Sequence, residues 1–241
     1  MRHNQLLVAV SRNGPKVTDG EWSYASLSHI MNPSERPSAL LVQLFMKRLM
    51  DIVIAGCALL VLLPLLLFCA LVIRLESKGP ALFTQWRWGR DGRKFKVFKF
   101  RSMRTELGDV SGVRQTVKND PRITRFGAFL RKSNIDELPQ LINVLKGDMS
   151  LVGPRCHAIG MKAAGLLYED LVPNYHLRHV MRPGITGLAQ MRGLRGPTDT
   201  PAKSRSRIAS DIYYVSNYSL MLDVKIILGT LRDEVFGGSG F

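Results

Sequence analysis

The sequence predicts an α/β domain joined to a helical membrane segment. An uncharged apolar run from Ile52 to Ile73 is long enough to enter or cross a lipid bilayer. Two short strand patterns separated by a Gly-rich turn follow this run, and apolar residues recur at helical spacing further along the chain. The length of 241 residues suits one domain of ordinary size with appendages.

The charge balance points to a polyanionic partner. Lys and Arg number 34 against 19 Asp and Glu, which gives a formal net charge of +15. Nucleic acid, an anionic membrane surface or a phosphorylated substrate would each fit this charge. The apolar run argues against nucleic acid and for a membrane. The three cysteines have no metal-ligand spacing, so we expect reduced thiols and neither a disulfide framework nor a cysteine metal site.

The topology of the membrane segment depends on Pro64, which lies in the middle of the apolar run. Proline removes a backbone donor and clashes with the preceding turn, so we expect a break or kink. Lys47 and Arg48 precede the run, and six Lys and Arg residues lie between residues 74 and 94. A spanning helix leaves most Lys and Arg on one side, which favours a re-entrant hairpin over a kinked spanning helix. We interpret Asp51 as a partner in an interfacial ion pair.

The chain divides into three parts. Residues 1–38 are polar and turn-rich and are predicted to form a flexible tail. Residues 39–77 form the predicted membrane hairpin. Residues 78–241 form the predicted α/β domain, which ends in an amphipathic helix.

Local patterns predict the main elements of this domain. Residues 81–86 and 94–100 read as the strands of a hairpin around a turn at residues 89–92. The alternation of apolar side chains slips at Val97-Phe98, which suggests a bulge. A helix is expected over residues 123–131.

A second helix begins with Ser219 as its cap and continues to about Phe236. Its apolar residues recur at helical spacing on one face, and Asp223 is expected to lie mostly elsewhere. This helix packs on the core or lies on the membrane surface, and the pattern alone leaves both interpretations open.

The most informative stretch places Asp136 and Glu137 at a helix N-terminus. Pro139 has no N–H and fits only the first turn of a helix, and Gly147 is a natural stop. The structural interpretation is a capping box with Ser133 or Asn134. The functional interpretation is an ionised carboxylate pair that acts as nucleophile and metal ligand.

Cations that could bind the phosphates of a substrate support the functional interpretation. Each of them alone would be an ordinary surface charge, but phosphoryl transfer depends mainly on positioning and charge stabilisation. The candidates are Lys99, Arg101, Arg131, Arg155 and Arg182.

Three motifs resemble the bacterial sugar transferase family, the monotopic phosphoglycosyl transferases that start exopolysaccharide and O-antigen synthesis. They are KFRSM at residues 99–103, DELPQLINVLKGDMSLVGPR at 136–155 and RPGITGLAQ at 182–190. The likeness runs from about Phe45 to about Leu231. It implies a small cytoplasmic α/β domain with interfacial amphipathic helices and a re-entrant membrane helix broken at a proline, here Pro64.

The resemblance also implies a mechanism. Asp136 would attack the sugar-proximal phosphorus of a UDP-sugar, UMP would leave, and undecaprenyl phosphate would then accept the covalently held sugar phosphate. Glu137 would bind Mg²⁺, and Arg131 and Arg155 match positions that hold phosphate. The implied location is the cytoplasmic face of the bacterial inner membrane, in contact with its lipid, and a homodimer is a candidate assembly.

Two loops, residues 155–158 and 195–200, look like those of the branch that transfers glucose 1-phosphate. The family usually has proline where this chain has Cys156, so a looser turn and an exposed thiol near the site are expected. The alternatives to an enzyme are a membrane-anchored polyanion-binding module and a non-catalytic scaffold for other polysaccharide enzymes.

Overall fold

The computed structural model describes residues 37–107, 120–172, 174–198 and 200–234. Almost all of the predicted tail therefore lies outside the described residues. The helices of four or more residues are α3 (Ser38–Glu76), α4 (Arg125–Lys132), α5 (Gln140–Lys146), α6 (Tyr168–Leu171), η6 (Tyr175–Val180), α7 (Leu188–Met191), α8 (Pro201–Ser216) and α9 (Leu220–Arg232). The strands are β1 (Leu82–Trp88), β2 (Lys94–Phe100), β3 (Ser150–Val152), β4 (Lys162–Ala163), β5 (Leu166–Leu167) and β6 (Gly184–Thr186).

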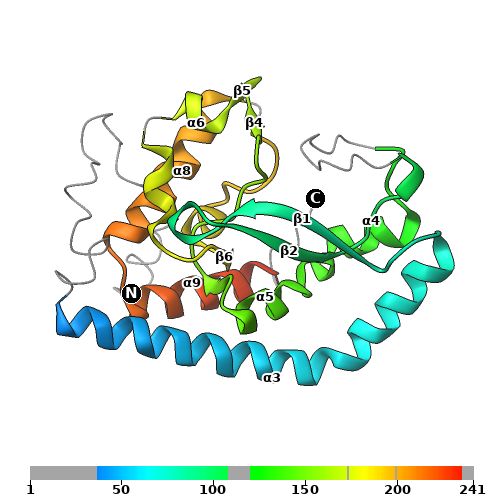
Figure 1. Cartoon of the computed structure of the whole chain (residues 1–241), viewed down its shortest axis with the longest axis horizontal. Coiled ribbons are helices and arrows are strands. Elements are labelled where there is room, and N and C mark those ends of the chain that lie inside the picture. Colours follow the sequence, from blue (N-terminus) through cyan, green and yellow to red (C-terminus); the bar gives the residue numbers. More distant parts are fainter. Residues whose placement is uncertain (1–36, 108–119, 173, 199, 235–241) are drawn as a thin grey trace.

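Helix α3 contains the whole apolar run and is long and apolar enough to cross a membrane. It continues through Pro64 without interruption and bends near its middle, as Figure 1 shows. Proline removes one helical hydrogen bond while the neighbouring bonds persist, so a bend is the expected outcome within a long helix. The kink expected at Pro64 therefore takes the form of a curved helix, without separation into two helices.

The N-terminal half of α3 docks on the α/β domain through buried polar contacts. Lys47 Nζ donates to Asp223 Oδ2 at 2.7 Å and to the Val152 carbonyl at 2.9 Å. Asp51 is 1% exposed and accepts from the Leu151 backbone N–H at 2.9 Å. The prediction of an interfacial ion pair for Asp51 is wrong, because its carboxylate lies against β3 and satisfies a buried backbone donor.

The C-terminal half of α3 packs on a different part of the same domain. Cys69 and Ile73 are buried with Phe100 of β2 and Leu130 of α4. Both halves of the long helix are thus fixed to one folded unit.

The hairpin and the first domain helix agree with the sequence prediction. Strands β1 and β2 pair antiparallel from Leu82↔Phe100 to Trp88↔Lys94 with an uninterrupted register, so the predicted bulge is wrong. The predicted helix is α4, and Thr124 caps it by accepting from the Gly127 N–H. Strands β3 and β6 pair in parallel, and β4 and β5 pair antiparallel.

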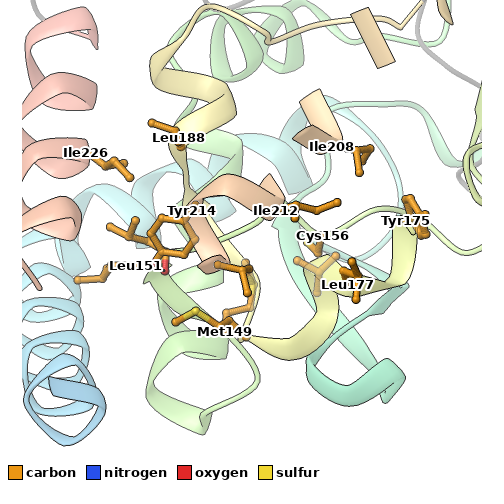
Figure 2. Close-up of a cluster of buried hydrophobic side chains, with 14 of the residues drawn as sticks. Met149, Leu151, Cys156, Tyr175, Leu177, Leu188, Ile208, Ile212, Tyr214 and Ile226 are labelled. Carbon is orange, nitrogen blue, oxygen red and sulfur yellow. Dashed lines mark hydrogen bonds between the residues drawn. The ribbon is translucent and has the colours of Figure 1, made fainter. Parts of the chain in front are cut away.

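The main hydrophobic core joins α5, β3, α8 and α9, and ten of its side chains are labelled in Figure 2. Cys156 belongs to this core and is 8% exposed. The expectation of an exposed thiol is therefore wrong. The small apolar side chain fills space in the cluster that also contains Ile212 and Leu177, a common role for free cysteine.

Helix α9 begins as predicted, because Ser219 accepts from the Leu222 N–H. Asp223 and Ile226 are fully buried. The expectation that Asp223 lies away from the packed face is wrong, since the side chain pairs with Lys47 and accepts from Tyr214 Oη at 2.7 Å. The apolar residues Met221, Val224, Leu228 and Leu231 point outward, which favours the membrane-surface interpretation.

Candidate active site

The acid pair lies in a single 3₁₀ turn, Ile135–Glu137, which Leu138 and Pro139 connect to α5. Asn134 precedes the turn with left-handed backbone angles, φ 54° and ψ 12°. Its side chain makes no capping hydrogen bond, and Ser133 Oγ donates to the Phe129 carbonyl of α4. The capping-box interpretation is therefore wrong, and the carboxylates are available for other partners.

Glu137 is held between two cations. Its carboxylate accepts from Lys99 Nζ at 2.7 Å and from Arg155 Nη1 at 3.0 Å, and Arg155 Nη2 makes a further bond. Burial acts to raise the pKa of Glu137, but Arg155 and Lys99 outweigh it and hold that pKa well below its usual range. Glu137 in turn raises the pKa of Arg155. The three side chains form a charged cluster, in which the lowered pKa of Glu137 keeps its carboxylate ionised at physiological pH.

Asp136 has a different environment. Burial is the largest effect on it and raises its pKa to about 6, with Glu137 acting in the same direction and Lys99, Arg131 and Arg155 opposing. Among the described residues, no donor hydrogen-bonds to its carboxylate. A desolvated carboxylate that is still mostly ionised at neutral pH suits a nucleophile.

The structure brings only some of the predicted cations to the acid pair. Lys99 and Arg155 contact Glu137, and Arg131, in the last turn of α4, interacts electrostatically with Asp136. Arg101 instead donates to carbonyls at the end of α3, including that of Ser77 at 2.7 Å. There it stabilises the C-terminus of α3.

Arg182 is also engaged away from the acid pair. Its Nε donates to the Gly147 carbonyl at 2.9 Å, at the far end of α5. Phosphate binding by Arg101 and Arg182 therefore stays a prediction without support from their contacts.

Arg178 and Asp211 form an ion pair beside the backbone of Arg155, and the sequence analysis predicted a role for neither residue. Arg178 Nε donates to Asp211 Oδ2 at 3.0 Å, and its Nη2 donates to the Arg155 backbone carbonyl. Both side chains are 1% exposed. A signal existed in the sequence: Asp211 is the only acid in α8, and it lies between the buried residues Ile208 and Ile212. A lone acid on an apolar helix face requires a buried partner.

The acid pair offers oxygen atoms of the kind that bind Mg²⁺. Among the described residues, no three His, Cys, Asp or Glu side chains gather to hold a metal. Mg²⁺ typically uses one or two carboxylates, water and substrate phosphates, so Glu137 and Asp136 provide suitable atoms. Because Glu137 already faces two cations, the residues fit a Mg²⁺ ion that arrives with the negative charge of a diphosphate.

Comparison with known proteins connects this site to a family. The family model described as bacterial sugar transferase matches residues 42–237. The exopolysaccharide production protein PSS of Rhizobium leguminosarum bv. phaseoli is 66% identical over 200 residues, which cover 83% of this chain and 100% of that protein.

Two further relatives are named UDP-glucose:undecaprenyl-phosphate glucose-1-phosphate transferase. The one from Caulobacter vibrioides is 50% identical over 77% of this chain and 68% of its own length. The one from Escherichia coli is 47% identical over 79% of this chain, but the match spans only 40% of that longer protein. The chain belongs to the bacterial sugar transferase family and is a phosphoglycosyl transferase.

Proposed function

We propose that this enzyme transfers glucose 1-phosphate from UDP-glucose to undecaprenyl phosphate and releases UMP. The reaction would start exopolysaccharide synthesis at the cytoplasmic face of the bacterial inner membrane. The observation that carries the proposal is the division between the two acids. Asp136 is half-buried and partial desolvation raises its pKa, while Glu137 is held by Lys99 and Arg155. The names of the relatives support the choice of substrates.

In the first step, a carboxylate oxygen of Asp136 attacks the β-phosphorus of UDP-glucose. The bond from this phosphorus to the bridging oxygen breaks, and the electron pair leaves with UMP. Lys99, Arg131 and Arg155 place positive charge around the reacting phosphate, where the transition state concentrates negative charge. The product of this step is glucose phosphate bound covalently to Asp136 through an acyl phosphate.

In the second step, a phosphate oxygen of undecaprenyl phosphate attacks the same phosphorus. The bond to Asp136 breaks, the carboxylate is regenerated, and undecaprenyl diphosphoglucose is released. Glu137 is the residue that would hold Mg²⁺, which when bound neutralises diphosphate charge. The site residues keep the carboxylate desolvated and hold the transferred phosphate while UMP and the lipid phosphate exchange.

We also propose that α3 is re-entrant. Lys47 and Asp51 near one end and Cys69 and Ile73 near the other are all buried against the same α/β domain. A straight spanning helix would carry these two groups to opposite faces of the bilayer. The part between them bears outward apolar side chains that suit the lipid interior: Leu60, Val61, Leu63, Leu65, Leu67, Phe68 and Leu71.

Labelling from each side of the membrane tests this topology. Single cysteines would replace Ser38 or Ser77 at the two ends of α3 in a chain without its native cysteines. Both positions should react with a membrane-impermeant maleimide only when the reagent reaches the cytoplasmic face. Reaction of the two positions from opposite faces would establish a spanning helix instead.

The reaction itself is tested by UMP release from a panel of UDP-sugars in the presence of undecaprenyl phosphate and Mg²⁺. We expect release with UDP-glucose and little with UDP-galactose or N-acetylated sugars. Preference for another UDP-sugar would correct the sugar assignment alone. A folded protein that releases no UMP with any of them would contradict the reaction, as the scaffold and polyanion-binding interpretations require.

A further inference from the structure

The carboxylate of Glu234 has no part in the proposed mechanism, but it joins two segments near the acid pair. Glu234, two residues beyond α9, accepts from Asn134 Nδ2 at 2.9 Å through Oε2. Through Oε1 it accepts from Arg195 Nη1 at 2.5 Å. The three residues are far apart in the sequence, so this contact depends entirely on the fold.

Asn134 determines how the chain enters the acid pair. It has the only left-handed backbone between α4 and α5, and the 3₁₀ turn with Asp136 follows immediately. Asn tolerates this conformation better than most residues. A hydrogen bond from its side chain to Glu234 therefore links the turn before Asp136 to the end of α9.

Arg195 lies on the loop between α7 and α8. One side of this loop is attached to α8, because Arg207 donates to the Leu194 carbonyl at 3.0 Å and to the Gly196 carbonyl at 2.7 Å. Arg195 lies between these two attachment points and reaches Glu234 on the other side. Arg207 thus holds the loop on one side and Glu234 holds it on the other. Glu234 also binds Asn134, which precedes the turn with Asp136.

We propose that Glu234 is a positioning residue that holds the Arg195 loop against the Asp136 turn, so that the loop borders the hexose of the UDP-sugar. Within the described residues Arg195 uses one guanidinium nitrogen on Glu234, which leaves other donors for sugar hydroxyl groups. This role rests on the proposed transfer from a UDP-hexose. The two bonds of Glu234 then have separate effects, one on the nucleophile and one on substrate binding.

The test measures kcat and KM for UMP release with UDP-glucose. Because a small misplacement of reacting groups is costly, we expect Glu234→Ala to lower kcat about tenfold and to raise KM for UDP-glucose about tenfold. Asn134→Gly keeps the left-handed backbone and should reproduce the fall in kcat alone. Arg195→Ala should reproduce the rise in KM alone. Glu234→Gln keeps an acceptor for Asn134 but loses the charge opposite Arg195, so its main effect should be on KM.

Asp233→Ala is the matched control, because within the described part of the chain this neighbouring acid pairs with the adjacent Arg232 alone, at 3.6 Å. It should leave both constants unchanged. The double variant Arg195→Ala/Glu234→Ala should raise KM by less than the product of the two single effects, because both changes act through the same loop. Thermal unfolding of each variant identifies any loss of folding.

Several results would overturn the positioning role. One is a folded Glu234→Ala enzyme with wild-type kcat and KM. Another is a change in kcat or KM in Glu234→Ala that neither Asn134→Gly nor Arg195→Ala shares. A third is unfolding of both Glu234→Ala and Glu234→Gln while Asn134→Gly and Arg195→Ala are fully active. An inactive wild-type protein would contradict the proposed transfer itself, whereas an active enzyme that is insensitive to these changes would contradict only the role of Glu234.

Discussion

Asp136→Asn should reduce UMP release by at least about a thousandfold, because an amide cannot act as the attacking oxyanion. The change removes a charge but almost no volume, so the fold should be preserved. The carboxylate accepts no hydrogen bond from the described residues, and its loss leaves no buried donor unsatisfied there. UMP release and the intact mass of the protein after incubation with UDP-glucose alone provide two readouts. Only the wild type should gain the mass of a sugar phosphate.

Asp148→Asn is the control for Asp136→Asn. Asp148 lies just beyond the opposite end of α5 and pairs with Lys146 at 3.2 Å. Its replacement should leave UMP release near the wild-type rate. If Asp136→Asn kept its activity while the chain remained folded, Asp136 would not be the nucleophile. A covalent adduct on Asp136→Asn would point to a different attacking group.

Asp211→Ala should destabilise the enzyme by about 3–5 kcal/mol, because it leaves the buried Arg178 guanidinium without its counter-charge. For a chain of this length that corresponds to a fall in Tm on the order of 10 °C. Thermal unfolding in detergent or nanodiscs measures the change. Asp170→Ala, at an exposed acid, should have almost no effect.

The double variant Arg178→Met/Asp211→Leu separates stability from positioning. Removing both charges together should recover much of the lost stability, since a buried ion pair often can be replaced by apolar side chains. Activity should nevertheless be lower than in the wild type, because the Arg155 carbonyl loses its donor from Arg178. Full activity in this variant would mean that Arg178 does not position Arg155. An unchanged Tm in Asp211→Ala would mean that the ion pair contributes little to the fold.

Elements with local causes could be predicted from the sequence. Pro139 and Gly147 define α5, Ser219 begins α9, and the strand alternation around residues 89–92 gives the hairpin. Each depends on a backbone property of one or two residues, which holds wherever the segment is placed. The apolar run likewise predicted a long helix, because few other structures use so many uncharged residues in a row, and α3 contains the whole run.

Side-chain partners could not be predicted in the same way. Nothing local distinguishes Arg155, which clamps Glu137, from Arg101, which binds carbonyls at the end of α3. Both are arginines in motifs near the acid pair, and only the path of the chain separates them. The burial of Cys156 and Asp223 likewise depends on distant helices that cover them. The catalytic roles of the acid pair remain predictions, although the geometry now distinguishes Asp136 from Glu137.

The docking of α3 fixes more than the fold. Lys47 and Asp51 bind the backbone of residues 151 and 152, only a few residues before Arg155. Helix α3 is therefore rigidly connected to the segment that carries Arg155, whereas a flexible linker would leave the two free to move. With α3 in the membrane as proposed, the site would stay at a constant height above the lipid headgroups, and a lipid acceptor in the same leaflet would meet it by diffusion in two dimensions. For a substrate that never leaves the bilayer, this fixed height would provide part of the positioning that binding contacts otherwise have to provide.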